Sequence, residues 1–295
     1  MDTNDYPPAN PDSTKQTTRR HFIQSSLGCV ATLALSSNLG SAADSAKAIP
    51  IGFQLYTVRG EFERDVPGTL KTIGEIGYKG VEFWAYAGTR NVYRDYSAMQ
   101  LRKMLDENGL KCCGMHVSLE AFADKNLKQT MENSHVLGGE YINLASATEH
   151  MKSEKGIAEL AALLNRVSDK CNEEKLVAGY HSHGFDFAKI NDHPAWELLF
   201  KRTKPEVNMQ LDVGNCLDGG GDPIAMLKEF PGRTRTTHIK EHEEKTFDSP
   251  FYKEVFQLFE TTAGTKWYIV EMGTRDGTGF DIPRKALAKL RSLGK

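Results

Sequence analysis

Histidines and carboxylates stand at regular places in this sequence, each at or directly after a short β-rich apolar run. His181 and His183 are two residues apart, so in a strand both side chains point to the same face. Asp212, His238 and Glu271 end later runs of the same kind. Mixed nitrogen and carboxylate donors suit a transition metal better than calcium, which prefers oxygen throughout. These residues therefore predict a site for one divalent metal ion, either manganese, zinc, cobalt or iron.

Other polar side chains at the ends of apolar runs are candidates for substrate binding and catalysis. We expect the substrate contacts to come from Gln54, Glu82, Trp84, Asn215 and Arg275. General bases work best when their pKa lies near the working pH, and an imidazole starts there. The candidate catalytic groups are His183, Lys240, Glu271 and His116.

Each of these side chains also has a purely structural explanation. Glu82 alone could pair with a nearby lysine, and His116 alone could be a hydrogen-bonded histidine of the core. Several unpaired carboxylates and imidazoles at one site would be costly to remove from water unless a cation bound them. The pattern as a whole therefore favours a metal site.

A repeating pattern of strands and helices must position these residues. The eight candidate strands are Ile51–Tyr56, Gly80–Trp84, Lys111–Val117, Tyr141–Ala145, Leu176–His181, Val207–Leu211, Thr236–Lys240 and Trp267–Glu271. Between them, apolar residues recur at three- and four-residue spacing, as in helices with one buried face. This alternation predicts an α/β fold, a (β/α)8 TIM barrel that forms a single domain over residues 49–295. The active site of such a barrel lies at the carboxyl ends of its strands, where the polar residues stand.

A doubly wound open sheet is the alternative α/β fold. It would be expected to carry a glycine-rich phosphate loop after its first strand. This chain has Tyr56-Thr57-Val58-Arg59-Gly60 at that place. The closed barrel is therefore the favoured prediction.

Local signals mark the ends of several helices. One apolar stripe runs from Phe62 to Ile76 and ends at Gly77, which predicts a helix with a glycine C-cap. Ser97 with Gln100 three residues later predicts a capping box. Asp222-Pro223 predicts a helix that begins with an N-cap and a first-turn proline.

The composition limits the class of partner. With 295 residues, 39% of them hydrophobic, the chain can bury a substantial core. The formal net charge of −2 shows no basic excess of the kind that binds phosphate backbones, so we expect no nucleic-acid partner. Cysteines at scattered spacings are expected to be small buried hydrophobes, and these are Cys112, Cys113, Cys171 and Cys216.

Residues 1–48 differ in kind from the rest. Arg19 and Arg20 precede a mildly apolar stretch, residues 25–39, and Ala46-Lys47-Ala48 has the form of a signal-peptidase site. We interpret this segment as a cleavable twin-arginine signal peptide, which implies the twin-arginine export machinery as a partner and a periplasmic or otherwise exported location. The alternative is a polar tail that happens to contain two arginines. The apolar stretch is too short for a stable membrane span.

Six pieces of the sequence resemble the xylose isomerase-like barrel superfamily, in particular the group of sugar phosphate isomerases and epimerases. The resemblance covers the chain from Ile51 to Leu293. The pieces are Gly52–Arg59, Gly80–Phe83, Tyr180–Phe187, Gln210–Asn215, His238–Lys240 and Val270-Glu271.

The resemblance implies one metal ligand from each of strands five to eight, which correspond here to His181, Asp212, His238 and Glu271. Similar isomerases and epimerases carry a glutamate at the position of His181, and two metal-bound glutamates move a proton on either side of a planar enediolate. His181 departs from that pattern. The departure leaves open which of His181 and His183 binds the metal.

The activity implied is that of a divalent-metal-dependent sugar isomerase or epimerase, which removes a proton next to a carbonyl of a small carbohydrate substrate. An exported enzyme would meet free sugars or glycosides, so the alternative is an exported 3-keto-glycoside lyase or hydratase. Two further alternatives are a non-catalytic sugar-binding barrel and a repair endonuclease. The endonuclease would need a positively charged groove and more metal-binding histidines.

Overall fold

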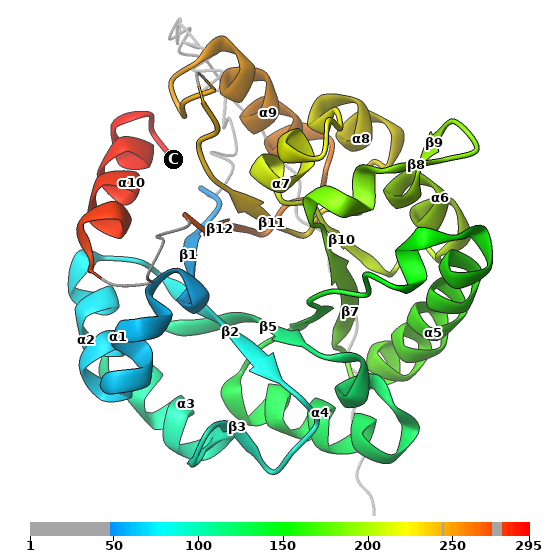
Figure 1. The fold of residues 1–295 in the computed structure, drawn as a ribbon. Helices are drawn as coiled ribbons and strands as arrows, with labels where there is room; N and C mark the ends of the chain where they lie inside the picture. The colour runs from blue at the N-terminus through cyan, green and yellow to red at the C-terminus, as the bar shows by residue number, and fades with distance from the viewer. Residues whose placement is uncertain (1–47, 244, 273–278) are drawn as a thin grey trace, which may run out of the picture. The chain divides into compact units, whose positions relative to one another are not determined.

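A closed ring of parallel strands forms the centre of the molecule (Figure 1). The computed structural model describes residues 48–243, 245–272 and 279–295. The eight strands of the main sheet are β1 Ile51–Gln54, β2 Gly80–Tyr86, β5 Lys111–Val117, β6 Tyr141–Leu144, β7 Val177–His181, β10 Asn208–Gln210, β11 Thr236–Ile239 and β12 Trp267–Val270. Their order is β10-β7-β6-β5-β2-β1-β12-β11, and a parallel bridge between Asp212 and His238 joins the two ends. The predicted TIM barrel is confirmed, and the open sheet is excluded.

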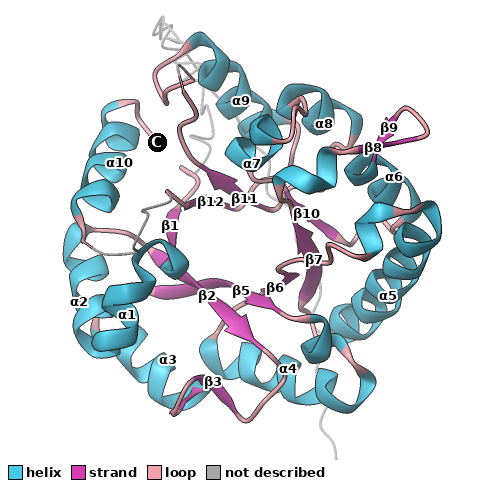
Figure 2. Cartoon of the chain, in the orientation of Figure 1, coloured by secondary structure: helices cyan, strands magenta, loops and turns pink. Residues whose placement is uncertain are grey.

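Helices surround this barrel on its outside (Figure 2). They are α1 Arg59–Arg64, α2 Val66–Ile76, α3 Ala98–Glu107, α4 Asp124–Leu137, α5 Glu154–Glu173, α6 Ala195–Arg202, α7 Val213–Asp218, α8 Pro223–Glu229, α9 Pro250–Thr261 and α10 Asp281–Ser292. Short 3₁₀ helices include η1 Leu55–Val58 and η4 Gly184–Phe187, and two hairpins lie in the loops, β3 Asn91–Tyr93 with β4 Tyr96–Ser97 and β8 Lys189–Ile190 with β9 His193–Pro194. None of the helices in the described ranges is long and apolar enough to cross a membrane.

The predicted caps are present. Ser97 and Gln100 form the expected capping box at the start of α3, and Asp222 accepts hydrogen bonds from two amides at the start of α8. Gly77 ends α2 in the left-handed conformation, with a φ of 105°. These signals act within a few residues of the chain, so the sequence was sufficient to predict them.

The stripe from Phe62 to Ile76 forms two helices rather than the single one predicted. Asp65 adopts an extended conformation between α1 and α2, and its side chain accepts a hydrogen bond of 2.9 Å from the amide of Gly68. Pro67 lies in the first turn of α2, where its missing N–H costs nothing, but it could not continue a helix from α1. The apolar spacing correctly predicted helical structure in this stretch, and Pro67 explains why it is divided into α1 and α2.

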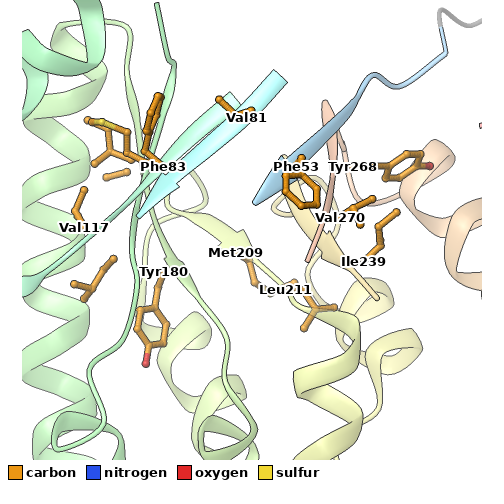
Figure 3. Close-up of a cluster of buried hydrophobic side chains, with 14 of the residues drawn as sticks. Phe53, Val81, Phe83, Val117, Tyr180, Met209, Leu211, Ile239, Tyr268 and Val270 are labelled. Atoms are coloured by element: carbon orange, nitrogen blue, oxygen red, sulfur yellow. The ribbon is translucent and has the colours of Figure 1, made fainter. Parts of the chain in front are cut away.

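The hydrophobic core lies between the barrel and its helices, where alternate strand residues point outward. Phe53, Val81, Met209 and Ile239 belong to this buried cluster (Figure 3). Their neighbours in the chain point into the barrel, and many of those are polar. The cysteines named above are all buried and free, as predicted. The inside of the barrel is therefore polar at the end where the strands terminate.

Candidate metal centre

Four side chains from neighbouring strands converge at the carboxyl end of the barrel. His181 ends β7, Asp212 follows β10, His238 belongs to β11 and Glu271 follows β12. These strands are consecutive around the closed ring, and the register pairs Gln210 with His181 and Asp212 with His238. One ligand atom from each of the four residues lies within 4.8 Å of the others. The structure thus brings together the set that the sequence predicted.

Several of these donor atoms are buried without hydrogen bonds from the described residues, namely both ring nitrogens of His181 and Oδ2 of Asp212. Nε2 of His181 lies 3.7 Å from Asp212 Oδ2 and 3.9 Å from Glu271 Oε2, too far for a hydrogen bond. Buried polar atoms are normally satisfied, because an unsatisfied one costs about 1–3 kcal/mol. Orphaned nitrogen and carboxylate donors that face one point fit a divalent transition metal.

His238 is held between two carboxylates. Its Nδ1 lies 3.0 Å from Glu271 Oε2, and its Nε2 lies 2.5 Å from Glu82 Oε2. Burial alone would lower the pKa of His238, but the charges of Glu82 and Glu271 raise it to about 10. His181 behaves oppositely, because burial and then the neighbouring imidazoles of His238 and His116 lower its pKa to about 3. His181 is therefore a neutral imidazole, the form that binds metals.

Lys240 lies beside the four donors as a cation. Its Nζ is 3.4 Å from Asp212 Oδ2 and 2.5 Å from the side-chain oxygen of Asn215. Burial alone would lower the pKa of Lys240, but Asp212 and Glu271 raise it, so the ammonium persists at neutral pH. Burial alone would likewise raise the pKa of Asp212, but Lys240 and the imidazoles hold it well below its usual range. Asn215 also donates to the backbone carbonyl of Ser182 at 2.9 Å, so both ends of its amide are occupied.

His183 lies next to this group but outside the four converging donors. Its ring meets that of His181 edge-on, with centroids 4.9 Å apart, and stacks on Phe185 at 5.3 Å. Nδ1 of His183 is buried without a hydrogen bond from the described residues. Burial, then the neighbouring imidazole of His116, lowers the pKa of His183, so its imidazole is neutral at pH 7.

A belt of buried polar side chains lies inside the barrel next to His238. Glu82 accepts hydrogen bonds from Gln54 and Gln210, each at 2.7 Å, and lies 3.1 Å from Nε2 of His116. His116 Nε2 is also 2.7 Å from the side-chain oxygen of Gln210. Gln54 and Glu82, predicted to contact the substrate, and His116, predicted to be catalytic, have their polar groups against one another in the structure.

Gln210 was not predicted as a site residue. Its position as a polar residue within the apolar run Val207–Leu211 could have indicated that it points into the barrel. Two other missed residues support the loops. Ser182 Oγ accepts a hydrogen bond of 2.9 Å from the amide of Asp212. Asp186 is buried and accepts hydrogen bonds from Tyr180 Oη at 2.9 Å and from the amide of His183 at 2.7 Å. Desolvation of Asp186 raises its pKa to about 7.

Trp84, the predicted sugar-stacking residue, is half-buried near the end of β2. Its ring packs against three aromatic neighbours, Phe62 at 5.4 Å, Tyr93 at 5.0 Å and Tyr56 at 5.9 Å between centroids. Tyr56 is 46% exposed, so this cluster reaches the surface. Arg275, the remaining predicted substrate contact, lies outside the described residues.

Comparison with known proteins agrees with this fold. Residues 70–293 match the family described as the xylose isomerase-like TIM barrel, and the chain therefore belongs to that family. No curated protein sequence matches the chain.

Solved structures with the same barrel have several different names. A sugar phosphate isomerase/epimerase from Parabacteroides distasonis is 24% identical with a TM-score of 0.71, covering 84% of this chain and 96% of that chain. An AP endonuclease, family 2, from Brucella melitensis is 16% identical with a TM-score of 0.62, covering 83% and 99%. A D-psicose 3-epimerase, solved in the presence of D-fructose, is 13% identical with a TM-score of 0.59, also covering 83% and 99%. At these levels of sequence identity, the similarity shows that the structures share a fold.

Proposed function

We propose that this protein is a divalent-metal-dependent enzyme that removes a proton next to a carbonyl group of a carbohydrate, as a sugar isomerase or epimerase does. The observation that carries the proposal is the convergence of ligand atoms from His181, Asp212, His238 and Glu271, of which those of His181 and Asp212 Oδ2 are buried without hydrogen-bond partners among the described residues. The names of its structural relatives, a sugar phosphate isomerase/epimerase and a D-psicose 3-epimerase, support the same chemistry.

His183 and Lys240, which lie beside the four donors, have different roles in the proposed reaction. A divalent cation held there would polarise a substrate carbonyl and so acidify the adjacent C–H bond. The neutral imidazole of His183 accepts that proton on its unprotonated ring nitrogen, since its lowered pKa leaves it neutral at pH 7. The ammonium of Lys240 donates a hydrogen bond, or a proton, to a substrate oxygen.

One observation favours a second candidate, β-elimination from a 3-keto-glycoside. His183 and Lys240 form a neutral base and a charged acid rather than two equivalent carboxylates. Elimination needs such an unlike pair: the base removes the proton at C2, the C–H electrons form the new double bond, and the glycosidic C–O bond breaks as the leaving oxygen takes a proton from the acid. Lys240 fits the role of that acid.

Incubation of metal-loaded protein in deuterated water separates the candidates. Free ketohexoses and a 3-oxidised glucoside are the substrates, and the metal-free Asp212→Asn variant is the control. Incorporation of carbon-bound deuterium without bond cleavage supports the isomerase or epimerase. Release of the aglycone supports the lyase. Neither exchange nor release with any of these substrates contradicts the proposed enzyme and leaves the sugar-binding barrel.

We also propose that residues 1–48 direct the protein out of the cytoplasm by the twin-arginine route, on the basis of the paired arginines and the small residues at Ala46 and Ala48. Fractionation of cells that express the full chain tests this proposal. The native chain is expected in the exported fraction, shortened at its N-terminus. Replacement of Arg19 and Arg20 by lysine is expected to retain it in the cytoplasm, and equal export of both forms would contradict the proposal.

A further inference from the structure

Glu82 is enclosed by donors on every side. Its side chain is 0% exposed. Oε1 accepts from Gln210 Nε2 at 2.7 Å, and Oε2 accepts from Gln54 Nε2 at 2.7 Å and lies 2.5 Å from His238 Nε2. An imidazole that binds a cation through one ring nitrogen keeps its proton on the other, and the ring nitrogen of His238 that lies against Glu82 is Nε2. Both oxygens of Glu82 therefore have hydrogen-bond partners within the protein.

We infer that Glu82 is a positioning residue for the metal centre: it keeps the proton of His238 on Nε2 and thereby presents Nδ1 as the metal-binding atom. The inference rests on the proposed function. Nδ1 is the nitrogen that faces the other donors, 3.0 Å from Glu271 Oε2 and 3.8 Å from Asp212 Oδ2. A carboxylate that holds the far nitrogen of a metal-binding imidazole fixes both the tautomer and the ring orientation.

The surroundings of Glu82 keep its carboxylate in place. Gly114 on the neighbouring strand β5 leaves room for it, since a Cβ on Gly114 would come 2.6 Å from Glu82 Oε1. The ring of His116 stacks on that of His238 with centroids 5.1 Å apart and an interplanar angle of 13°. His238 is thus restrained by a carboxylate at one edge and by a ring on one face.

His181 is held less firmly than His238. Neither of its ring nitrogens has a hydrogen-bond partner among the described residues, although it stands in the same cluster. The two histidines therefore differ in how they are held: His238 has its orientation fixed in advance, whereas nothing in the described part of the chain fixes the tautomer of His181. Loss of Glu82 should consequently act on the metal through His238.

The affinity for zinc tests the inference without any substrate. Glu82→Gln keeps the shape of the side chain but removes its charge and one acceptor oxygen, and zinc affinity is measured by competition with a chromophoric chelator. We expect the variant to bind zinc about 10–100-fold more weakly than the wild type. The matched control is Glu197→Gln, a buried carboxylate on α6 that contacts Lys201 and His193, and it is expected to bind zinc as the wild type does.

Nitrogen-15 NMR of the zinc-loaded wild type gives a second measurement, which holds even if the Glu82 variant does not fold. The expected spectrum shows His238 protonated at Nε2 and bound to zinc through Nδ1. Zinc bound through Nε2, or equal zinc affinity in folded Glu82→Gln and wild type, would overturn the inference while the proposed function stands. Absence of zinc, manganese and cobalt binding by the wild type would overturn both.

Discussion

The aliphatic stem of Lys240 lies directly against Gly214, so that a Cβ on Gly214 would come 2.2 Å from Cε and 2.4 Å from Cγ of Lys240. Gly214 belongs to α7, which begins after Asp212, the residue whose Oδ2 lies 3.4 Å from Lys240 Nζ. The missing side chain of Gly214 therefore allows the ammonium of Lys240 to reach Asp212, one of the four candidate metal donors.

Gly214→Ala should displace Lys240 without unfolding the protein. The backbone of Gly214 does not require a positive φ, so alanine conflicts only with the lysine stem. We expect a loss of turnover that approaches the loss in Lys240→Met, about 10²–10⁴-fold, since that is the usual contribution of a positioned acid. Metal affinity should not fall in either variant, because each removes a competing cation from Asp212. Wild-type turnover in Gly214→Ala would refute this role of the glycine.

Metal loading should stabilise the folded protein. A ligand at one hundred times its Kd adds about 2.7 kcal/mol, or an increase of about 5–10 °C in the melting temperature of a domain of this size. Thermal unfolding with manganese or zinc, and again after a chelator, measures the shift. His181→Ala and Asp212→Asn are expected to lose it, whereas His183→Ala should retain it. A shift that disappears in His183→Ala but persists in His181→Ala would reverse the assignment of the ligand.

Gln210 should contribute to stability more than to metal chemistry. Its amide donates to Glu82 at 2.7 Å and to Thr236 Oγ1 at 3.0 Å, and its oxygen lies 2.7 Å from His116 Nε2. Gln210→Leu leaves these buried groups without partners, and each unsatisfied group costs about 1–3 kcal/mol. Urea denaturation is expected to show a loss of about 3 kcal/mol or more. A change below about 1 kcal/mol would mean that the buried side chains around Gln210 find new hydrogen-bond partners in the variant.

Asp186 should make stability fall as the pH rises. Its pKa is about 7 in the folded protein, against 3.8 in the unfolded chain. Between these values the folded state holds a proton that the unfolded state has released, so the stability contribution is complete below about pH 4 and is lost as the pH passes 7. The slope from this group is at most about 1.4 kcal/mol per pH unit.

The comparison of wild type with Asp186→Asn isolates that effect from other titrating groups. The asparagine stays neutral at every pH, so unfolding experiments at pH 4.5 and 7.5 should show a smaller pH-dependent loss in the variant. Identical pH dependence in both proteins would show that Asp186 does not titrate in this range.

The sequence alone determined the features that depend on neighbours in the chain. The alternation of apolar residues predicted the barrel strands, and the caps at Ser97 and Asp222 predicted the starts of two helices, because these signals act over one or two turns. The residues that end the strands predicted which side chains converge as candidate metal donors, since all parallel strands of a barrel terminate at one mouth.

Only the tertiary structure decided the partners of the inward-facing side chains. Glu82 contacts His238 across 156 positions and Gln210 across 128, and nothing local to Glu82 distinguishes a substrate contact from a buried support. The closure of the ring brings these strands together, and the resulting burial and contacts lower the pKa of His181 and raise those of His238 and Lys240. Pairing between distant residues is a property of the closed barrel, whereas a strand carries only its own alternation.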